Sequence, residues 1–312
     1  MRREKLPSWT EILREISVGH DAIRRKYLKA LSEKTGRNII AYYSGWLQKD
    51  QLAVQGVFDF GINDEDKSGF MAAVYQMDRS KGLDLILHTP GGQMAATESL
   101  VDYLRSRFGT NIRAIIPQIA MSAGTLIALA CKEIVMGTHS SLGPFDPQVS
   151  GVSAHGVLEE FERACRDVTE DSRLIPIWQP IIAKYNPTLV GECEKASKWA
   201  EDLVRTWLAS GMFSDETDTR GRTEKIDRVI QELGEHSWTL SHARHISASK
   251  ASEIGLRIYE LEADNELQDL VLSVHHAFIL TFSGTAAVKI IENQEGKAFV
   301  KQVRQSLVAM PG

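Results

Sequence analysis

The sequence predicts an α/β fold in which a mainly parallel sheet is covered by helices, with further helices added at both ends. Strand-like runs alternate with amphipathic helical segments from residue 38 onward. These strands are almost continuously apolar, which is typical of parallel strands that are buried on both faces. The chain has 312 residues and 43% hydrophobic content, so it can bury a substantial core as one large domain.

The expected elements of the first half follow in chain order. Ser8 opens a capping box for a first helix, and a second helix ends near Gly36, where a glycine cap is expected. Strands and helices then alternate. They are the strand NIIAYYS, a helix capped near Asn63, the strand LDLILHT, a helix at 94–108, the strand IRAIIP, a helix at 122–131 and the strand EIVMG.

The second half is mostly helical after Asp146. Helices are expected at 157–167, 189–210 and 223–233, followed by a helix and returning strand within 247–261, a helix at 267–282 and the segment AVKIIEN. We therefore expect an N-terminal helical extension at 1–37, a core at 38–262 with a helical insertion at about 155–235, and a helical tail at 263–312.

Composition and motifs exclude several classes of protein. The net charge of -5, without a block of Lys and Arg, argues against a nucleic-acid partner. The three cysteines lack metal or redox spacing, so we expect reduced thiols in a cytoplasmic protein. Neither a phosphate loop nor a dinucleotide fingerprint is present, so no cofactor and no metal are expected.

One uncharged segment, residues 114–131, is almost long enough to span a membrane. Its internal Pro117, Ser122 and Gly124 favour a buried strand, a turn and a buried helix instead. The basic start of the chain runs directly into a charged amphipathic helix, without the apolar region of a secretory signal. We expect no membrane span.

Two turns carry the strongest chemical signal. The run His88-Thr89-Pro90-Gly91-Gly92 ends one strand, and Met121-Ser122-Ala123-Gly124 opens a helix about thirty residues later. Both follow a strand and precede a helix, so both should lie at the carboxyl edge of the sheet, where α/β proteins bind ligands. Glycines let backbone amides approach a carbonyl oxygen, and Ser122 lies among such amides. This pattern predicts an oxyanion hole beside a serine nucleophile.

The motifs HTPGG, AMSAGT and EIVMGTHSSLGPFDPQ resemble those of the Clp-protease class of serine peptidases. The sequence is more closely similar to the serine dehydrogenase proteinase family, through S-H-x-R-x-I at 241–246, LQDLVLSVHHAF and AVKIIEN. The resemblance covers roughly residues 38–300. It implies a ClpP/crotonase-like spiral of ββα units, a peptide or protein substrate, a homo-oligomer and a possible regulatory partner protein.

The base that activates Ser122 departs from the Clp-protease pattern. In that pattern a histidine follows the serine by about 25 residues, but this chain has Asp146 near that position. Our leading hypothesis is that His242 is the general base and Asp146 orients it, because a triad is defined by geometry and not by chain order. The related family motif reads S-H-G-R-P-I, which matches His242, whereas Ala243 and His245 depart from it.

In this hypothesis the oxyanion is held by the backbone amides of Gly92 and Ala123, and Gly91 shapes the turn. Three alternatives remain. A Ser–Lys dyad would use a desolvated Lys184 as the base. A catalytically inactive scaffold would bind peptides without cleaving them. A crotonase-like enzyme would use the same oxyanion turns on an acyl-CoA.

Overall fold

The computed structural model describes residues 19–303, apart from residue 57, residues 235–240 and residue 242. The helix expected at Ser8 lies outside the described residues. In chain order, the elements before the main helical region are α2 (His20–Thr35), β1 (Asn38–Ser44), α3 (Asp50–Val54), α4 (Asp64–Val74), β2 (Leu83–His88), α5 (Met94–Phe108), β3 (Ile112–Ile116), β4 (Ile119–Ala120), α6 (Ala123–Leu129), β5 (Glu133–Met136) and β6 (Ser141–Leu142).

The remaining elements are mainly helical at first and then return to the sheet. They are β7 (Gln148–Val149), β8 (Val152–Ser153), α7 (Ala154–Glu170), α8 (Ile175–Ile182), α9 (Leu189–Ser210), α10 (Thr219–Gly234), β9 (Ile246–Ser247), α12 (Ala248–Ile254), β10 (Ile258–Glu260), α13 (Asn265–Gly284), β11 (Ala287–Asn293) and β12 (Ala298–Gln302).

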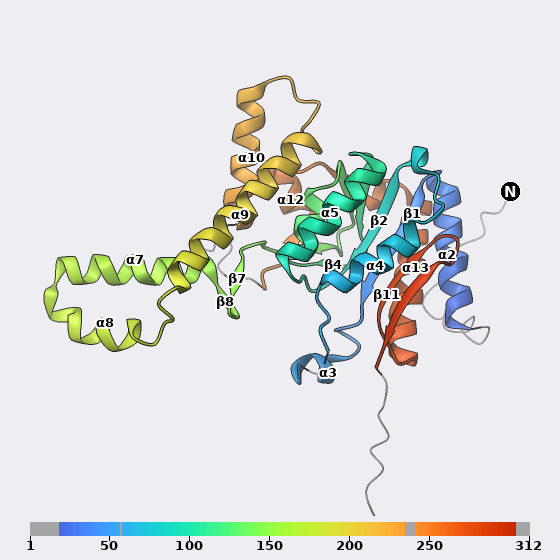
Figure 1. Cartoon of the computed structure of the whole chain (residues 1–312). Coiled ribbons are helices and arrows are strands. Elements are labelled where there is room, and N and C mark those ends of the chain that lie inside the picture. Colours follow the sequence, from blue (N-terminus) through green and yellow to red (C-terminus); the bar gives the residue numbers. More distant parts are fainter. Residues whose placement is uncertain (1–18, 57, 235–240, 242, 304–312) are drawn as a thin grey trace, which may run out of the picture.

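The main sheet has seven strands in the order β10-β5-β3-β2-β1-β11-β12 (Figure 1). The first five are parallel to one another, and β11 and β12 join antiparallel at the β1 side. The predicted α/β fold with a mainly parallel sheet is confirmed. Two small ladders, β4-β6-β9 and β7-β8, lie outside this sheet.

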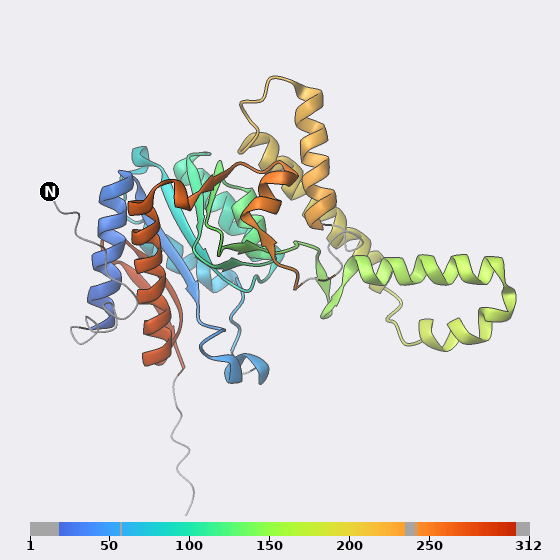
Figure 2. The same cartoon turned by 180° about the vertical axis from the view of Figure 1, so that it is seen from behind.

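Helices cover both faces of the sheet and define two cores. On one face α2 and α13 pack side by side, as Figure 2 shows from behind. On the other face α4, α5 and α6 pack on the strands. Within β2, Ile86 belongs to the first core, whereas Leu85 and Leu87 belong to the second. This division follows from the alternation of side chains along a strand.

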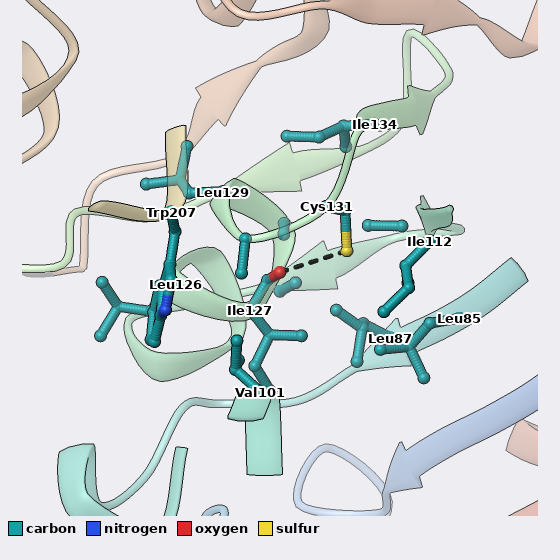
Figure 3. Close-up of a cluster of buried hydrophobic side chains, with 14 of the residues drawn as sticks. Leu85, Leu87, Val101, Ile112, Leu126, Ile127, Leu129, Cys131, Ile134 and Trp207 are labelled. Carbon is teal, nitrogen blue, oxygen red and sulfur yellow. Dashed lines mark hydrogen bonds between the residues drawn. The ribbon is translucent and has the colours of Figure 1, made fainter. Parts of the chain in front are cut away.

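The uncharged segment 114–131 folds as expected into strand, turn and buried helix. It comprises most of β3, then β4 and α6, and every residue of α6 is buried. Figure 3 shows Leu126, Ile127 and Leu129 of this helix packed between strands β2 and β3, helix α5 and Trp207 of α9, with the Cys131 thiol donating to Ile127 O at 3.3 Å. Among the described helices, none combines the length and apolarity needed to cross a bilayer.

Several predicted boundaries agree closely with the structure. Helices α5 and α9 have the predicted ends, α4 begins after Asn63, and α2 ends at Gly36 with a left-handed φ of 68°. Helix α8 was not predicted. Its sequence, IPIWQPII, contains two prolines, which usually argue against a helix.

Helices α7 and α8 and the first part of α9 form an arm that projects from the body of the molecule (Figures 1 and 2). A small core holds the arm together, including Ala154, Val157, Leu189 and Cys193. The second part of α9 returns to the body, where Val204, Trp207 and Leu208 join the main core.

The prediction that residues 263–312 form a helical tail is wrong in one respect. After α13 the chain adds β11 and β12 to the main sheet, so this segment completes the core. All seven residues of β11 are buried, including Lys289, Glu292 and Asn293. These polar residues obscured the strand in the sequence. Glu292 is paired with buried Arg24 at 2.7 Å, and Asn293 donates to Ala73 O at 2.7 Å.

Candidate active site

Ser122 occupies a sharp turn between strand β4 and helix α6. Its backbone has φ 49° and ψ -115°, a positive φ that non-glycine residues rarely adopt. A serine on a strained strand-to-helix turn presents its hydroxyl away from the backbone, as in a nucleophile elbow. The local backbone therefore fits a reactive position for this side chain.

Within residues 19–303 as the structure describes them, three serines directly precede α-helices, and they differ in what their hydroxyls do. Ser153 accepts from Gly156 N at 3.2 Å, and Ser247 accepts from Lys250 N at 3.3 Å, so both are ordinary helix caps. Ser122 makes no such capping bond to α6. Its hydroxyl therefore does not cap the helix that it precedes.

The two glycine-containing turns lie side by side because their strands are bridged. Thr89 N donates to Ile119 O and Met121 N donates to Thr89 O, both at 3.1 Å. This Thr89–Ala120 bridge joins the segment after β2 to β4. A Cβ on Gly124 would lie 2.5 Å from Thr89 Cγ2, so the close approach of the two turns requires glycine there.

The Gly91-Gly92 turn packs directly against the serine. A Cβ on Gly91 would lie 2.7 Å from Ser122 Cβ, and one on Gly92 would lie 2.1 Å from Ile62 N. Both glycines also have positive φ, 112° and 154°. Ile62 N donates to Gly91 O at 2.7 Å and Gln93 N donates to Ile62 O at 2.8 Å, which holds the turn in place.

Two backbone amides of these turns remain available for a ligand. Within the described part of the chain, neither Gly92 N nor Ala123 N donates a backbone hydrogen bond, whereas Gly91 N donates to Thr89 Oγ1 at 3.2 Å. Gly92 and Ala123 both line the cavity that contains Ser122. This arrangement can hold a negatively charged oxygen beside the serine.

The cavity at Ser122 has a volume of about 530 Å³. Its apolar lining comes from several elements and includes Met94, Leu126, Phe145 and Ala196, the last from α9. Polar side chains of Asp59, Gln93 and Gln148 also line it. Neither Lys nor Arg is among the described residues of this lining.

Asp146 lies buried beside this cavity, 1% exposed, between two residues that line it, Phe145 and Pro147. The segment that carries it follows β6, and Phe145 N is fixed to Leu233 O at 2.8 Å. The structure thus brings Asp146 to the same region as Ser122, Gly91, Gly92 and Ala123.

The predicted base, His242, lies outside the described residues. Its neighbours in the S-H-x-R-x-I motif are described, and both Ser241 and His245 are exposed. Ile246 of β9 pairs antiparallel with Leu142 of β6. The motif therefore reaches the strand from which the Asp146 segment departs.

Lys184, the alternative base, is exposed in the connection between α8 and α9. This connection belongs to the arm, and Lys184 is not among the residues that line the Ser122 cavity. Within the described ranges, no group of His, Cys, Asp and Glu side chains could hold a metal ion.

A cluster of histidine and aromatic rings lies on the other face of the sheet from α6, at the end of β2. The His88 ring centroid is 4.5 Å from that of Trp46, 5.4 Å from Tyr43 and 5.2 Å from His275. Burial without a compensating charge lowers the pKa of His88 from 6.5 to about 3. The His88 ring is therefore neutral at physiological pH, and it packs with the other rings at the end of the strand that leads into the glycine turn.

Two residues that are important for this geometry were assigned no role from the sequence. Thr89 bridges the two turns, and Thr125 bonds to both Ala120 and Gly143. The signal for Thr125 was weak: it is the single hydroxyl residue in the otherwise apolar run TLIALA, where a hydroxyl needs a buried partner.

Comparison with known proteins agrees with this geometry. A family model described as ClpP-like SDH-type serine proteinase matches residues 16–272. Two proteins of Methanocaldococcus jannaschii, named uncharacterized protein MJ0137 and uncharacterized protein MJ1495, are 30% and 28% identical to this chain over 237 residues. Each alignment covers 75% of this chain, with 73% and 71% of the respective relative.

Proposed function

The chain belongs to the ClpP-like SDH-type serine proteinases, and from that premise we propose that it hydrolyses peptide bonds through an acyl-enzyme on Ser122. The observation that carries the proposal is the strained Ser122 elbow packed on the Gly91-Gly92 turn, in a cavity that is also lined by Gly92 and Ala123, whose amides donate no backbone hydrogen bond within the described residues. Acyl transfer needs both a nucleophile and stabilisation of the oxyanion, and this arrangement supplies both.

The proposed reaction begins when the Ser122 hydroxyl attacks the carbonyl carbon of the scissile peptide bond. The amides of Gly92 and Ala123 stabilise the negative oxygen that forms, and Gly91 keeps the turn close enough to do so. Loss of one such donor typically costs ~3 kcal/mol in the barrier. Collapse of the intermediate releases the amine and leaves an ester on Ser122, which water then hydrolyses.

We assign the general base to His242 and its orienting carboxylate to Asp146. Two features support this assignment. Asp146 is buried at the cavity, and the β6–β9 pairing brings the S-H-x-R-x-I motif to the strand that leads to Asp146. In each half-reaction the imidazole would take a proton from the attacking hydroxyl or water and return it to the leaving group.

The other candidates lack comparable support. Lys184 lies in the arm, so a Ser–Lys dyad is not favoured. An acyl-CoA carries phosphates that a site usually binds with cations, and the described lining of the Ser122 cavity contains no Lys or Arg. Its apolar walls and backbone amides suit a peptide better.

Labelling with a fluorophosphonate probe tests the nucleophile. The wild-type protein should be labelled, and Ser122→Ala should not. Ser247→Ala is a matched control, because Ser247 also precedes a short helix but its hydroxyl caps that helix. If the folded wild-type protein is not labelled, a peptide-binding scaffold becomes the better reading of the site.

Peptide hydrolysis by His242→Ala and Lys184→Ala then identifies the base. We expect His242→Ala to abolish hydrolysis and Lys184→Ala to retain it. A histidine base should also give an acid limb near ~6.5 in the pH-rate profile. The reverse pattern, with activity that depends on Lys184, would replace the triad by a dyad.

A further inference from the structure

Thr125 lies in the first turn of α6, three residues after Ser122, and its side chain is fully buried. Its hydroxyl contacts three backbone groups from two other segments. Gly143 N donates to Thr125 Oγ1 at 3.0 Å, and this oxygen also lies 2.9 Å from Ala120 O and 2.8 Å from Gly143 O. The single hydroxyl proton is donated to one of these two carbonyls.

The hydroxyl occupies the position of a missing rung in the ladder between β4 and β6. These strands are parallel, with Ala120 paired to Leu142, and Ser141 N donates to Gln118 O at 2.7 Å. Since the bonds of a parallel ladder recur every two residues, the next rung would run from Gly143 N to Ala120 O. Instead, Gly143 N bonds to the Thr125 hydroxyl, which lies within bonding distance of Ala120 O.

This inserted hydroxyl lies where two functional segments diverge. One strand continues from Ala120 into the Ser122 elbow, and the other continues from Gly143 to Asp146. The segments still touch, because a Cβ on Gly143 would lie 2.5 Å from Met121 Cε. The spacing between elbow and Asp146 segment therefore depends on a hydroxyl group placed between them.

We propose that Thr125 is a positioning residue whose hydroxyl sets the separation between Ser122 and the segment that carries Asp146. This inference rests on the proposed function of Ser122 and deepens it. Without the hydroxyl, Gly143 N either loses its hydrogen-bond acceptor or donates directly to Ala120 O. Both outcomes shift the 143–147 segment relative to the elbow, although Thr125 itself does not touch the substrate.

The test compares Thr125→Val, which keeps the shape of the side chain but removes the hydroxyl, with Thr125→Ser, which keeps the hydroxyl. We expect Thr125→Val to lower kcat for peptide hydrolysis by about 10- to 100-fold, with KM changed less than about threefold, because misalignment affects the transition state more than binding. Thr125→Ser should restore kcat to within about threefold of the wild-type value.

A pH profile separates positioning from a merely structural role. A well-placed Asp146 carboxylate stabilises the protonated base and raises its pKa, so its displacement should move the acid limb of kcat/KM to lower pH. Thr281→Val is the matched control. Thr281 is also buried and bonded, to Ala277 O at 2.8 Å, but lies on α13 at the opposite face of the sheet. The Thr281→Val variant should have a lower free energy of unfolding but an unchanged pH profile of kcat/KM.

Circular dichroism at the assay temperature gives the folded fraction of each variant, and each rate is divided by the concentration of folded protein. If Thr125→Val does not fold, Thr125→Ala at reduced temperature takes its place against Thr125→Ser. Wild-type kcat and an unchanged acid limb in the hydroxyl-free variant, with Ser122→Ala inactive, would overturn the role of Thr125 alone. Hydrolysis that survives in Ser122→Ala would instead overturn the proposed function.

Discussion

His88 makes the stability of this protein depend on pH in a way that can be calculated. Its side chain is fully buried against Trp46, Tyr43 and His275. Neither of its ring nitrogens has a hydrogen-bond partner among the described residues. Burial lowers its pKa in the folded protein from 6.5 to about 3. The folded state therefore favours the neutral ring, and the unfolded chain takes up the proton more readily.

The direction of the pH dependence follows from the difference between the pKa of His88 in the folded and in the unfolded state. Because the folded pKa is depressed, the stabilisation is fully present above pH 6.5 and is lost as the pH falls towards the folded value. At pH 5 the unfolded chain gains ~2 kcal/mol from protonating this one ring, relative to pH 8. This figure depends on the unfolded pKa, since the folded ring is still neutral at pH 5.

The assay is urea unfolding of the wild-type protein and of His88→Phe at pH 8 and pH 5. Phenylalanine keeps an aromatic ring in the cluster but cannot be protonated. The loss of unfolding free energy between the two pH values should be smaller in the variant by ~2 kcal/mol. His245→Phe, at an exposed histidine, controls for the loss of a histidine in general. Equal pH dependence in wild type and His88→Phe would refute the reasoning.

Two further substitutions test the geometry of the glycine turn and the buried Lys289–Asp66 ion pair, respectively. Gly92→Ala should lower kcat by about 10²- to 10³-fold, because its Cβ would clash with the Ile62 backbone and displace the proposed oxyanion donor. Gly191→Ala, where nothing lies within 4 Å, should leave hydrolysis unchanged. Lys289→Met removes the buried partner of Asp66, 3.0 Å away, and should destabilise the fold by about 3–5 kcal/mol in thermal or urea unfolding. Adding Asp66→Asn to Lys289→Met should recover part of this loss, and a double variant less stable than the single one would contradict the role of an uncompensated buried charge.

The alternation of apolar strands and helices was enough to predict the parallel part of the sheet, because each of these elements signals its own structure locally. Strand β11 was harder, because its polar residues find partners that are distant in sequence. Lys289 donates to Asp66 and to Gly61 O, and Glu292 pairs with Arg24. No local pattern reveals that such side chains will be buried and paired.

The same distinction applies to the site. The strand-turn-helix setting of Ser122 and the two glycines was predictable, because a few consecutive residues indicate each of these elements. Thr125 was not, because its role depends on the missing rung at Gly143, eighteen residues away along the chain. The position of the base remains a prediction from the family motif.

Ala196 connects helix α9, part of which belongs to the arm, with the wall of the Ser122 cavity. It lies on α9, a 22-residue helix of about 33 Å that runs without interruption from the arm into the main core. Because one continuous helix belongs both to the arm and to the cavity wall, we expect a change in the angle of the arm to change the width of the Ser122 cavity.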